Sequence, residues 1–358
     1  LKLVQRIDRS RFTPEVCSLT NINQLSSAFA ECGIKVDSLN MKQGVPDPRG
    51  VFRFVKHLRK SPPDLVQTWM YHSDLLGSIG AKLVGNLPVV WNVRNSDLNP
   101  SSSSKSTILT ARICGLMSRA IPKKIICCAS SCVDIHAKLG YAKEKFVVIP
   151  NGFDIAKFNV CHKSRAELRN ELGVPEEAII VGYAARFDPQ KDHEMFLQAA
   201  QLSLNRYHDT HFVLCGYGTT WENGALVNSI KALGLQDNIH LLGVRNDMPR
   251  IYNAFDIACL SSAYGEAFSN AVGEAMACGT PCVVTDVGDS AFIVGDAGYS
   301  VPRGEPEAFS AACCRLIGFD RERRLGLGHL ARQRISDNFS LDEVVKKYEN
   351  TYSSILNQ

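Results

Sequence analysis

Two basic side chains stand five residues apart in the segment AARFDPQKDH, where Arg186 and Lys191 follow the apolar run AIIVGYA. A guanidinium grips phosphate oxygens with a fork of N–H donors, and an ammonium adds a mobile point charge. Together they suit a diphosphate, because they would neutralise the negative charge that builds on a departing nucleotide diphosphate. Taken alone, the pair is better explained as chance basic residues of a solvated loop.

Two carboxylates eight residues apart lie in AYGEAFSNAVGEAMACGTPC. The pattern predicts a helix over 268–278, and the free N–H groups near Ser269 and Asn270 at its start make a phosphate site that the helix dipole reinforces. Glu274, inside this helix, could accept hydrogen bonds from ribose hydroxyls, and Glu266, at the tip of the loop, could reach the transferred sugar. A surface carboxylate and a salt-bridged helix residue are the alternatives for Glu266 and Glu274.

Polar residues also follow apolar runs in the first half of the chain. His72 comes after DLVQTWM, where an imidazole can donate to a sugar hydroxyl or transfer a proton, and a structural hydrogen-bonding histidine is the alternative. Arg94, Asn95 and Asp97 follow PVVWNV and are expected to line an acceptor pocket, with a buried structural ion pair as the alternative.

The elements that must position these residues alternate along the whole chain, as in doubly wound α/β domains. The second half gives strands AIIVGYA, HFVLCG, NIHLLG, DIACL and PCVVTD, with helices near 192–206, 222–233, 247–254 and 268–278. The first half gives strands EVCSL, KVDSL, DLVQTW, PVVWNV, KIICCA and FVVIP, with helices near 21–32, 49–60, 73–84, 106–119 and 131–139. Ligands of such folds bind outside the carboxyl ends of the strands, so the important residues should follow strands.

Three segments follow from this alternation. Residues 1–150 form an N-terminal Rossmann-like domain, 151–340 a second one, and 341–358 an amphipathic C-terminal helix. The join is expected at VVIPNGFD, where a strand ends and a turn leads into a polar connector.

In this order, the motifs resemble those of glycosyltransferase family 4. GEAFSN followed by GEAMACGTPCV resembles the E-x₇-E element of that family, AARFDPQKDH its basic loop, and PNGFD its interdomain connector, so that the resemblance covers nearly the whole chain. It implies a GT-B fold with two Rossmann-like domains facing across a cleft, retention of anomeric configuration, and no divalent metal or other cofactor.

The resemblance also implies roles for particular residues. Arg186 and Lys191 would hold the donor diphosphate, Glu274 the ribose and Glu266 the donor sugar, while His72 would face the cleft near the transferred sugar. His72, Arg186, Lys191 and Glu266 are therefore the expected catalytic residues. The remaining expected donor-binding residues are Gly216, Ala267, Phe268, Ser269 and Asn270, although glycine is common in the family where this chain has Ala267.

Family members usually begin with a strand and a glycine-rich loop, followed by a helix that resembles LKLVQRIDRSRF. This chain begins inside that helix, so we expect about twenty residues to be missing from its N-terminus. The missing part would include one strand of the first sheet and part of the acceptor floor.

Charge is divided unevenly between the two halves. Residues 1–150 contain 21 Lys and Arg against 10 Asp and Glu, whereas the whole chain of 358 residues has a net charge of only +4. A basic half suits phosphate or acidic lipid, and an ordinary solvated surface is the alternative. The stretch KSTILTARICGLMSRAIPKK is basic and amphipathic, which suits a membrane surface carrying a lipid-linked sugar, or equally a core-packed helix. The basic residues are not interleaved with stacking aromatics, so nucleic acid is not expected.

No apolar run reaches the roughly 20 residues that span a bilayer, and the 13 cysteines are scattered through apolar segments, as thiols of a reducing compartment are. We expect a cytoplasmic protein, peripheral on the inner face of the plasma membrane.

The expected function is transfer of a hexose-type sugar from a UDP- or GDP-linked donor to a glycan or polyprenyl-diphosphate-linked acceptor in cell-surface polysaccharide synthesis. The nucleotide diphosphate would leave with oxocarbenium character and could itself take the proton of the attacking hydroxyl. A sugar-nucleotide epimerase and an inactive nucleotide-binding scaffold are the alternatives. A dehydrogenase is disfavoured, because no G-x-G-x-x-G follows a first strand.

Overall fold

The computed structural model describes residues 1–21, 26–42, 47–98 and 103–357. The chain divides into two compact units, of which one comprises Leu1–Gly152 together with Leu341–Gln358 and the other comprises Phe153–Ser340. The chain therefore passes from the first unit to the second at Gly152 and returns after Ser340.

The second unit is built on a parallel sheet with the strand order β12-β11-β10-β7-β8-β9. Its strands are β7 (Ile179–Ala184), β8 (Thr210–Cys215), β9 (Ile239–Leu241), β10 (Ile257–Leu260), β11 (Cys282–Thr285) and β12 (Gly298–Val301). The helices are α7 (His162–Leu172), α8 (His193–Leu204), α9 (Gly224–Ala232), α10 (Met248–Ala254), α11 (Asn270–Ala277), α12 (Ser290–Val294), α13 (Pro306–Ile317) and α14 (Arg321–Phe339). Strand order reverses next to β7, so the segments after β7 and β10 leave the sheet side by side.

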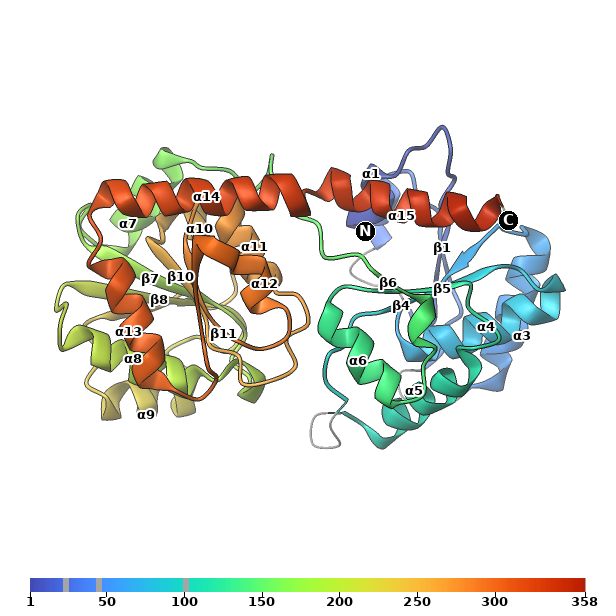
Figure 1. Cartoon of the computed structure of the whole chain (residues 1–358), viewed down its shortest axis with the longest axis horizontal. Helices are drawn as coiled ribbons and strands as arrows, with labels where there is room; N and C mark the ends of the chain where they lie inside the picture. Colours follow the sequence, from blue (N-terminus) through green and yellow to red (C-terminus); the bar gives the residue numbers. More distant parts are fainter. Residues whose placement is uncertain (22–25, 43–46, 99–102, 358) are drawn as a thin grey trace. The chain divides into compact units, whose positions relative to one another are not determined.

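Helices cover both faces of this sheet, as Figure 1 shows. On one face, α8, α9 and α13 supply the apolar side chains of the main core, where Tyr183 of β7 stacks on Phe196 of α8 with ring centroids 4.6 Å apart. The strands β7, β8, β10 and β11 are buried on both faces, which explains why they are largely apolar runs.

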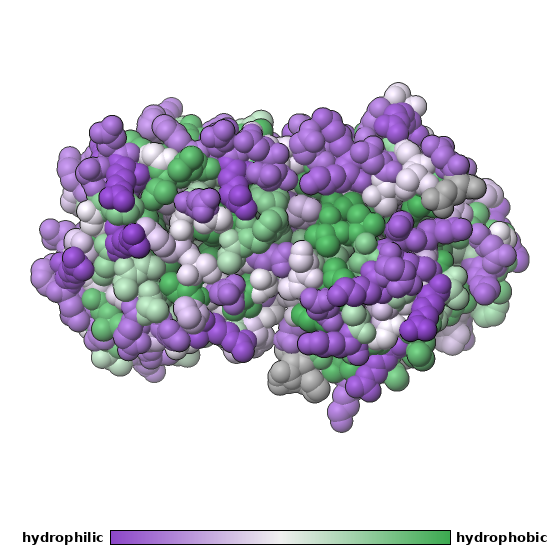
Figure 2. All heavy atoms as spheres, viewed as in Figure 1, coloured by the Kyte–Doolittle hydropathy of each residue, from purple (hydrophilic) through white to green (hydrophobic). Residues whose placement is uncertain are grey.

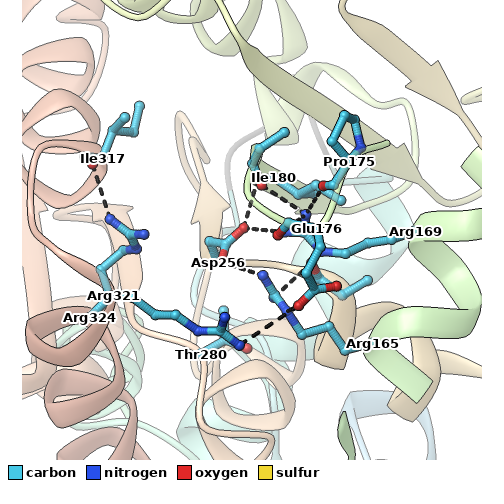
Figure 3. Close-up of polar contacts among 12 residues, drawn as sticks. Arg165, Arg169, Pro175, Glu176, Ile180, Asp256, Thr280, Ile317, Arg321 and Arg324 are labelled. Atoms are coloured by element: carbon cyan, nitrogen blue, oxygen red, sulfur yellow. Dashed lines mark hydrogen bonds and ion pairs between the residues drawn. The ribbon is translucent and has the colours of Figure 1, made fainter. Parts of the chain in front are cut away.

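One carboxylate, 11% exposed, joins three elements of the second unit at the amino ends of the strands (Figure 3). Asp256, just before β10, accepts from Arg169 of α7 at 2.5 Å, from Arg165 of α7 at 2.8 Å, and from the N–H of Ile180 in β7 at 2.8 Å. Arg169 is 1% exposed and also donates to the carbonyls of Pro175 and Ala178. This network attaches α7 to the sheet.

The first unit contains a four-stranded parallel sheet and a separate parallel pair. The sheet has the order β3 (Val66–Gln67), β4 (Val89–Val93), β5 (Lys124–Cys127) and β6 (Phe146–Val148), and the pair is β1 (Val16–Ser18) with β2 (Val36–Ser38). The helices are α1 (Lys2–Arg6), α2 (Ser26–Glu31), α3 (Pro48–Lys60), α4 (Tyr71–Gly85), α5 (Lys105–Met117), α6 (Ser130–Lys138) and α15 (Leu341–Leu356).

The C-terminal helix α15 completes the core of the first unit. Figure 1 shows α15 and α1 along one side of the strands β4 to β6, with α5 and α6 on the other side. Leu341, Val344 and Tyr348 of α15 are buried against Val90 of β4 and Ile126 of β5. The helix forms because its apolar residues recur every three or four positions and so share one face.

Several expected elements differ from the structure. The opening segment LKLVQRIDRSRF is helical only over Lys2–Arg6, and the polar connector expected after Asn151 contains the helix α7. The helix expected near 21–32 is described only from Ser26, since residues 22–25 lie outside the described residues. The helix expected over 268–278 begins at Asn270, because Ser269 is its N-cap.

All thirteen cysteines are free thiols, and most of them are buried. Within the described ranges, no helix has the length and hydropathy needed to cross a bilayer.

Candidate functional site

The loop after β7 carries both predicted phosphate ligands, Arg186 and Lys191, and they differ in exposure and in their hydrogen-bond partners. Arg186 is 54% exposed and bends back onto its own loop, where its Nε donates to Asp188 at 3.2 Å and its Nη2 donates to Gln190 at 2.8 Å. Asp188 also caps the short 3₁₀ turn Pro189–Lys191 by accepting from the N–H of Gln190. Arg186 is thus an accessible cation on a well-formed turn.

Lys191 is almost buried, with 12% of its side chain exposed, and its Nζ contacts Oε2 of Glu266. Its backbone is fixed as well, because its carbonyl accepts from the hydroxyls of Tyr183 and Ser261. The next residue, Asp192, has a φ of +49° and caps α8 through the N–H of Met195. The strand β7, the segment after β10 and the start of α8 therefore all determine where the ammonium lies.

Glu266 is 9% exposed, so the alternative of a surface carboxylate is wrong. Besides Lys191, the Ser262 hydroxyl donates to Glu266 Oε2 at 3.0 Å. The backbone of Glu266 lies directly on Gly288, where an added Cβ would be 1.5 Å from the Glu266 carbonyl oxygen, and Gly288 has a φ of +61°. Only glycine fits there, and no sequence motif indicated a role for this residue.

Helix α11 begins immediately after the Glu266 loop. The Ser269 hydroxyl accepts from the N–H of Val272 at 3.4 Å, which makes Ser269 the N-cap of a helix that starts at Asn270. The side chains of Ala267 and Phe268 are buried, so these residues could meet a ligand only through their backbone. Glu274, one turn further along, is half-buried and accepts from the Tyr252 hydroxyl at 3.4 Å.

Gly216 brings the loop after β8 against the loop after β7. Its φ is +151°, and an added Cβ would be 2.2 Å from the Ala185 carbonyl oxygen and 2.9 Å from the Arg186 nitrogen. The predicted donor residues thus come from the carboxyl ends of three adjacent strands, β10, β7 and β8. The structure gathers these residues within one unit.

A buried histidine supports the same loop. His193 is 3% exposed and lies between the rings of Tyr183 and Phe187, with centroids 4.9 and 5.1 Å away. Burial, together with the nearby Lys191 ammonium, lowers the pKa of His193 to about 4. The imidazole of His193 is therefore uncharged at neutral pH.

In the first unit, the segment after β3 leads to His72, which is exposed on the first turn of α4. Met70, which precedes the helix, has a φ of +70°, a conformation that non-glycine residues adopt rarely. Thr68 donates at 2.5 Å to Asp74, a fully buried residue of α4, and burial raises the pKa of Asp74 well above its usual range. This bond attaches the end of β3 to the start of α4.

Arg94 follows the neighbouring strand β4 and is engaged by several groups of its own unit. Its Nε donates to Asn92 at 2.9 Å, its Nη2 donates to the Tyr348 hydroxyl at 2.5 Å, and its Nη1 donates to Asn151. Asn95 accepts from the N–H of Asp97 at 2.9 Å, and both side chains are partly buried. His72 and these three residues follow two strands that are paired in the same sheet.

Among residues 1–21, 26–42, 47–98 and 103–357, no three His, Cys, Asp or Glu side chains lie close enough together to bind a metal ion. Metal independence stays a prediction.

Two family models match the chain, one in each half. The model of glycosyltransferase family 4 matches residues 3–157, and the model of glycosyl transferases group 1 matches residues 178–318. The expected membership of a glycosyltransferase family is confirmed.

Curated relatives are glycosyltransferases of bacteria. An Escherichia coli UDP-Gal:alpha-D-GlcNAc-diphosphoundecaprenol alpha-1,3-galactosyltransferase is 27% identical over 86% of this chain and 80% of its own length. The capsular polysaccharide biosynthesis glycosyltransferase CapM of Staphylococcus aureus is 22% identical over 87% of this chain and 82% of its own length. A D-inositol 3-phosphate glycosyltransferase of Salinispora tropica is 32% identical, over 57% of this chain and 45% of its own length.

Solved structures share the fold. Anabaena Alr3699/HepE in complex with UDP has a TM-score of 0.86 and 22% identity, with 99% of this chain and 95% of that chain covered. The apo form of the lipopolysaccharide outer core galactosyltransferase WaaB has a TM-score of 0.74 and 15% identity, with 98% and 93% covered. The expected GT-B fold of two Rossmann-like α/β units is confirmed.

Proposed function

The chain belongs to the family 4 glycosyltransferases, and from this premise we propose that it moves a hexose-type sugar from a nucleotide diphosphate donor to a glycan or a polyprenyl-diphosphate-linked sugar. The donor is UDP- or GDP-linked, the anomeric configuration is retained, and the product belongs to cell-surface polysaccharide synthesis. The Escherichia coli relative, named for UDP-Gal and a diphosphoundecaprenol-linked sugar, supports both substrate classes. The UDP complex of the Anabaena structure supports the donor.

The observation that carries the proposal is the contact between Lys191 and Glu266 beside the start of α11. An ammonium has three N–H donors, so Lys191 can stay paired with Glu266 and still donate to a phosphate oxygen. The amino end of α11 adds a positive potential at the same place. Lys191 and Arg186 therefore stabilise the charge of the leaving diphosphate, and Glu266 accepts from a hydroxyl of the donor sugar.

The other donor residues act around this centre. Glu274 accepts from the ribose, while Gly216, Ala267, Phe268, Ser269 and Asn270 approach the donor mainly through their backbone. The acceptor binds the first unit near His72, Arg94, Asn95 and Asp97, and His72 contacts the reacting sugar. This division makes residues 1–150 the acceptor domain and 151–340 the donor domain.

The acceptor domain also meets an anionic membrane surface at the inner face of the plasma membrane. Leu109 and Leu116 of α5 are 61% and 80% exposed, and Leu83 of the adjacent α4 is 58% exposed. Taken together, α3, α4 and α5 have more Lys and Arg than Asp and Glu, and their one carboxylate, Asp74, is buried. Figure 2 shows hydrophilic and hydrophobic residues intermixed over the region where Figure 1 labels α4 and α5.

The test is steady-state kinetics of the Lys191→Ala variant with UDP- and GDP-sugars and a lipid-linked sugar acceptor. Loss of the ammonium should lower kcat by about a hundredfold or more, since removal of one donor to a developing charge has effects of this size. Lys163→Ala is the matched control, because Lys163 is 85% exposed on α7. Unchanged turnover of the Lys191 variant would contradict the phosphate assignment.

Product analysis separates the alternatives. A glycosyltransferase converts nucleotide sugar into free nucleotide and a glycoside, and the anomeric coupling of the glycoside in NMR reports retention. An epimerase would return an isomeric nucleotide sugar, and an inactive scaffold would bind the donor without hydrolysis or transfer.

A further inference from the structure

Trp69, at the carboxyl end of β3, exposes 44% of its surface. An indole is one of the largest apolar side chains, and its amphipathic ring suits a binding surface. The chain has two other tryptophans: Trp91 is fully buried and donates to Ser78, and Trp221, in the second unit, is 48% exposed.

Trp69 is held in one orientation. The Arg94 guanidinium lies 5.0 Å from its ring centroid, and the Tyr348 ring is stacked beside it at 6.5 Å with an interplanar angle of 22°. The guanidinium cannot drift, because Asn92, Asn151 and the Tyr348 hydroxyl all accept from it. Asn92 also donates to the Tyr348 hydroxyl at 2.9 Å.

This rigid indole lies among the residues assigned to the acceptor. His72 follows it by three residues on the first turn of α4, and Met70 between them has a strained φ of +70°. The strand that ends before Arg94 and Asn95 pairs directly with β3. Trp69 and the acceptor residues therefore share one edge of the sheet.

We propose that the exposed face of Trp69 is the stacking platform for a pyranose ring of the acceptor, and that Arg94 is a positioning residue that holds this platform. The inference rests on the proposed function. A pyranose ring carries its C–H bonds on faces that lack hydroxyls, and such a face packs on the electron-rich face of an indole. An aromatic surface that loses little entropy on binding is well suited to this contact.

Contact of the acceptor with Trp69 fits the geometry better than direct contact with Arg94 does. Three nitrogens of Arg94 already donate to protein acceptors, whereas nearly half of the Trp69 surface remains open. The guanidinium thus contributes to the acceptor site through the indole. A sugar hydroxyl would be met by His72 and Asn95 instead.

The experiment uses the three indole N–H signals of the full chain, labelled at tryptophan and assigned by single Trp→Phe variants. Methyl α-D-glucopyranoside and methyl α-D-galactopyranoside are the sugar probes. At least one of them should shift the Trp69 signal, while buried Trp91 and exposed Trp221 stay unchanged. Equal shifts of Trp69 and Trp221 would overturn the proposal, since they would report a general solvent effect.

Two further probes distinguish other ligands. If UDP or farnesyl phosphate shifted the Trp69 signal and neither glycoside did, the indole would contact the nucleobase or the lipid chain, and the proposal would be wrong. UDP affinity, measured by calorimetry, tests the donor site independently. Tight UDP binding with an unresponsive Trp69 would contradict this inference alone, whereas absence of UDP binding would contradict the proposed function.

Variants distinguish the role of Trp69 as the stacking platform from the role of Arg94 as the residue that positions it. Trp69→Ala should weaken sugar-probe binding about tenfold, and Trp69→Phe should retain most of it, because a smaller aromatic face remains. Arg94→Lys and Tyr348→Phe should weaken it about threefold and broaden the Trp69 signal, since each removes a bond that fixes the guanidinium. UDP affinity and the Trp91 signal should stay unchanged in all four. A sharp, unshifted Trp69 signal in Arg94→Lys would overturn the positioning role.

Discussion

Gly288 illustrates how a residue without chemistry of its own can position a reactive one. The Glu266 carbonyl oxygen lies where a Cβ of residue 288 would be, and the φ of +61° already disfavours other residues. Gly288→Ala should lower the free energy of unfolding by about 2 kcal/mol or more and raise the donor KM, because the Glu266 segment must move. Urea denaturation and donor kinetics measure the two effects.

Gly173 provides the matched control for this substitution. It has nearly the same φ, +65°, and no atom lies within 4 Å of its added Cβ. Gly173→Ala should therefore cost only the conformational strain, about 1 kcal/mol, and leave the kinetics unchanged. If both variants behaved alike, the close approach at Glu266 would have no effect on the site.

His193 makes the stability of the chain depend on pH. Its pKa is lowered by burial to about 4 in the folded state, whereas an exposed imidazole has a pKa near 6.5. Between these values the unfolded chain binds more protons, so stability falls as the pH falls. From pH 7 to pH 5 the loss from this residue should be about 2 kcal/mol.

The measurement is urea denaturation at both pH values for the native chain and for His193→Gln, which cannot titrate. The variant should lose less stability over this interval. An equal loss in both proteins would show that the imidazole is not responsible.

Residue types and spacing were enough to select the charged residues that stay predicted donor ligands. Arg186, Lys191, Glu266 and Glu274 follow strands, and the structure brings them to neighbouring strand ends. The pairing of Lys191 with Glu266 was not predictable, because it depends on loops that meet only in the folded sheet. Gly288 escaped notice for the same reason.

The packing of helix α7 on the sheet depends on Asp256, whose carboxylate joins α7, β7 and β10. Asp256→Asn should lower the free energy of unfolding by about 3–5 kcal/mol, because it leaves the charge of buried Arg169 without its partner. Chemical denaturation measures the change. Lys163→Ala, which removes an exposed i,i+4 pair with Glu167 on the same helix, should change stability by less than about 1 kcal/mol. Comparable losses would mean that the buried pair is no stronger than the surface pair.

The strands could be predicted well where both faces are buried, because continuous β-branched runs are distinctive. The edge strand β12 was missed, since its residues are only partly buried and GYSV lacks such a run. Helix α14 was missed because its sequence, RERRLGLGHLARQRISDNF, is so polar that its few buried residues leave a weak apolar stripe. Helix α7 was missed because, as its polar sequence HKSRAELRNEL shows, it is attached largely by arginines and carboxylates.

For the protein as a whole, the exposed leucines of α5 predict attachment to acidic bilayers. Leu109→Glu with Leu116→Glu should lower binding to phosphatidylglycerol vesicles about tenfold or more, because apolar area is lost and negative charge is added. Vesicle sedimentation measures the bound fraction. Leu330→Glu is the control, since Leu330 is 52% exposed on α14, a helix that also carries several arginines. A loss confined to the control would move the attachment surface to the second unit.

The return of the chain after Ser340 has a consequence for biosynthesis. Leu341, Val344 and Tyr348 pack in the core of a unit whose other residues end at Gly152. The whole second unit, Phe153–Ser340, is therefore translated between the two parts of that core. During translation the sheet of the N-terminal part therefore has an exposed apolar face until α15 is made. The second unit can fold before that. Chaperones that shield such surfaces are needed most during this interval.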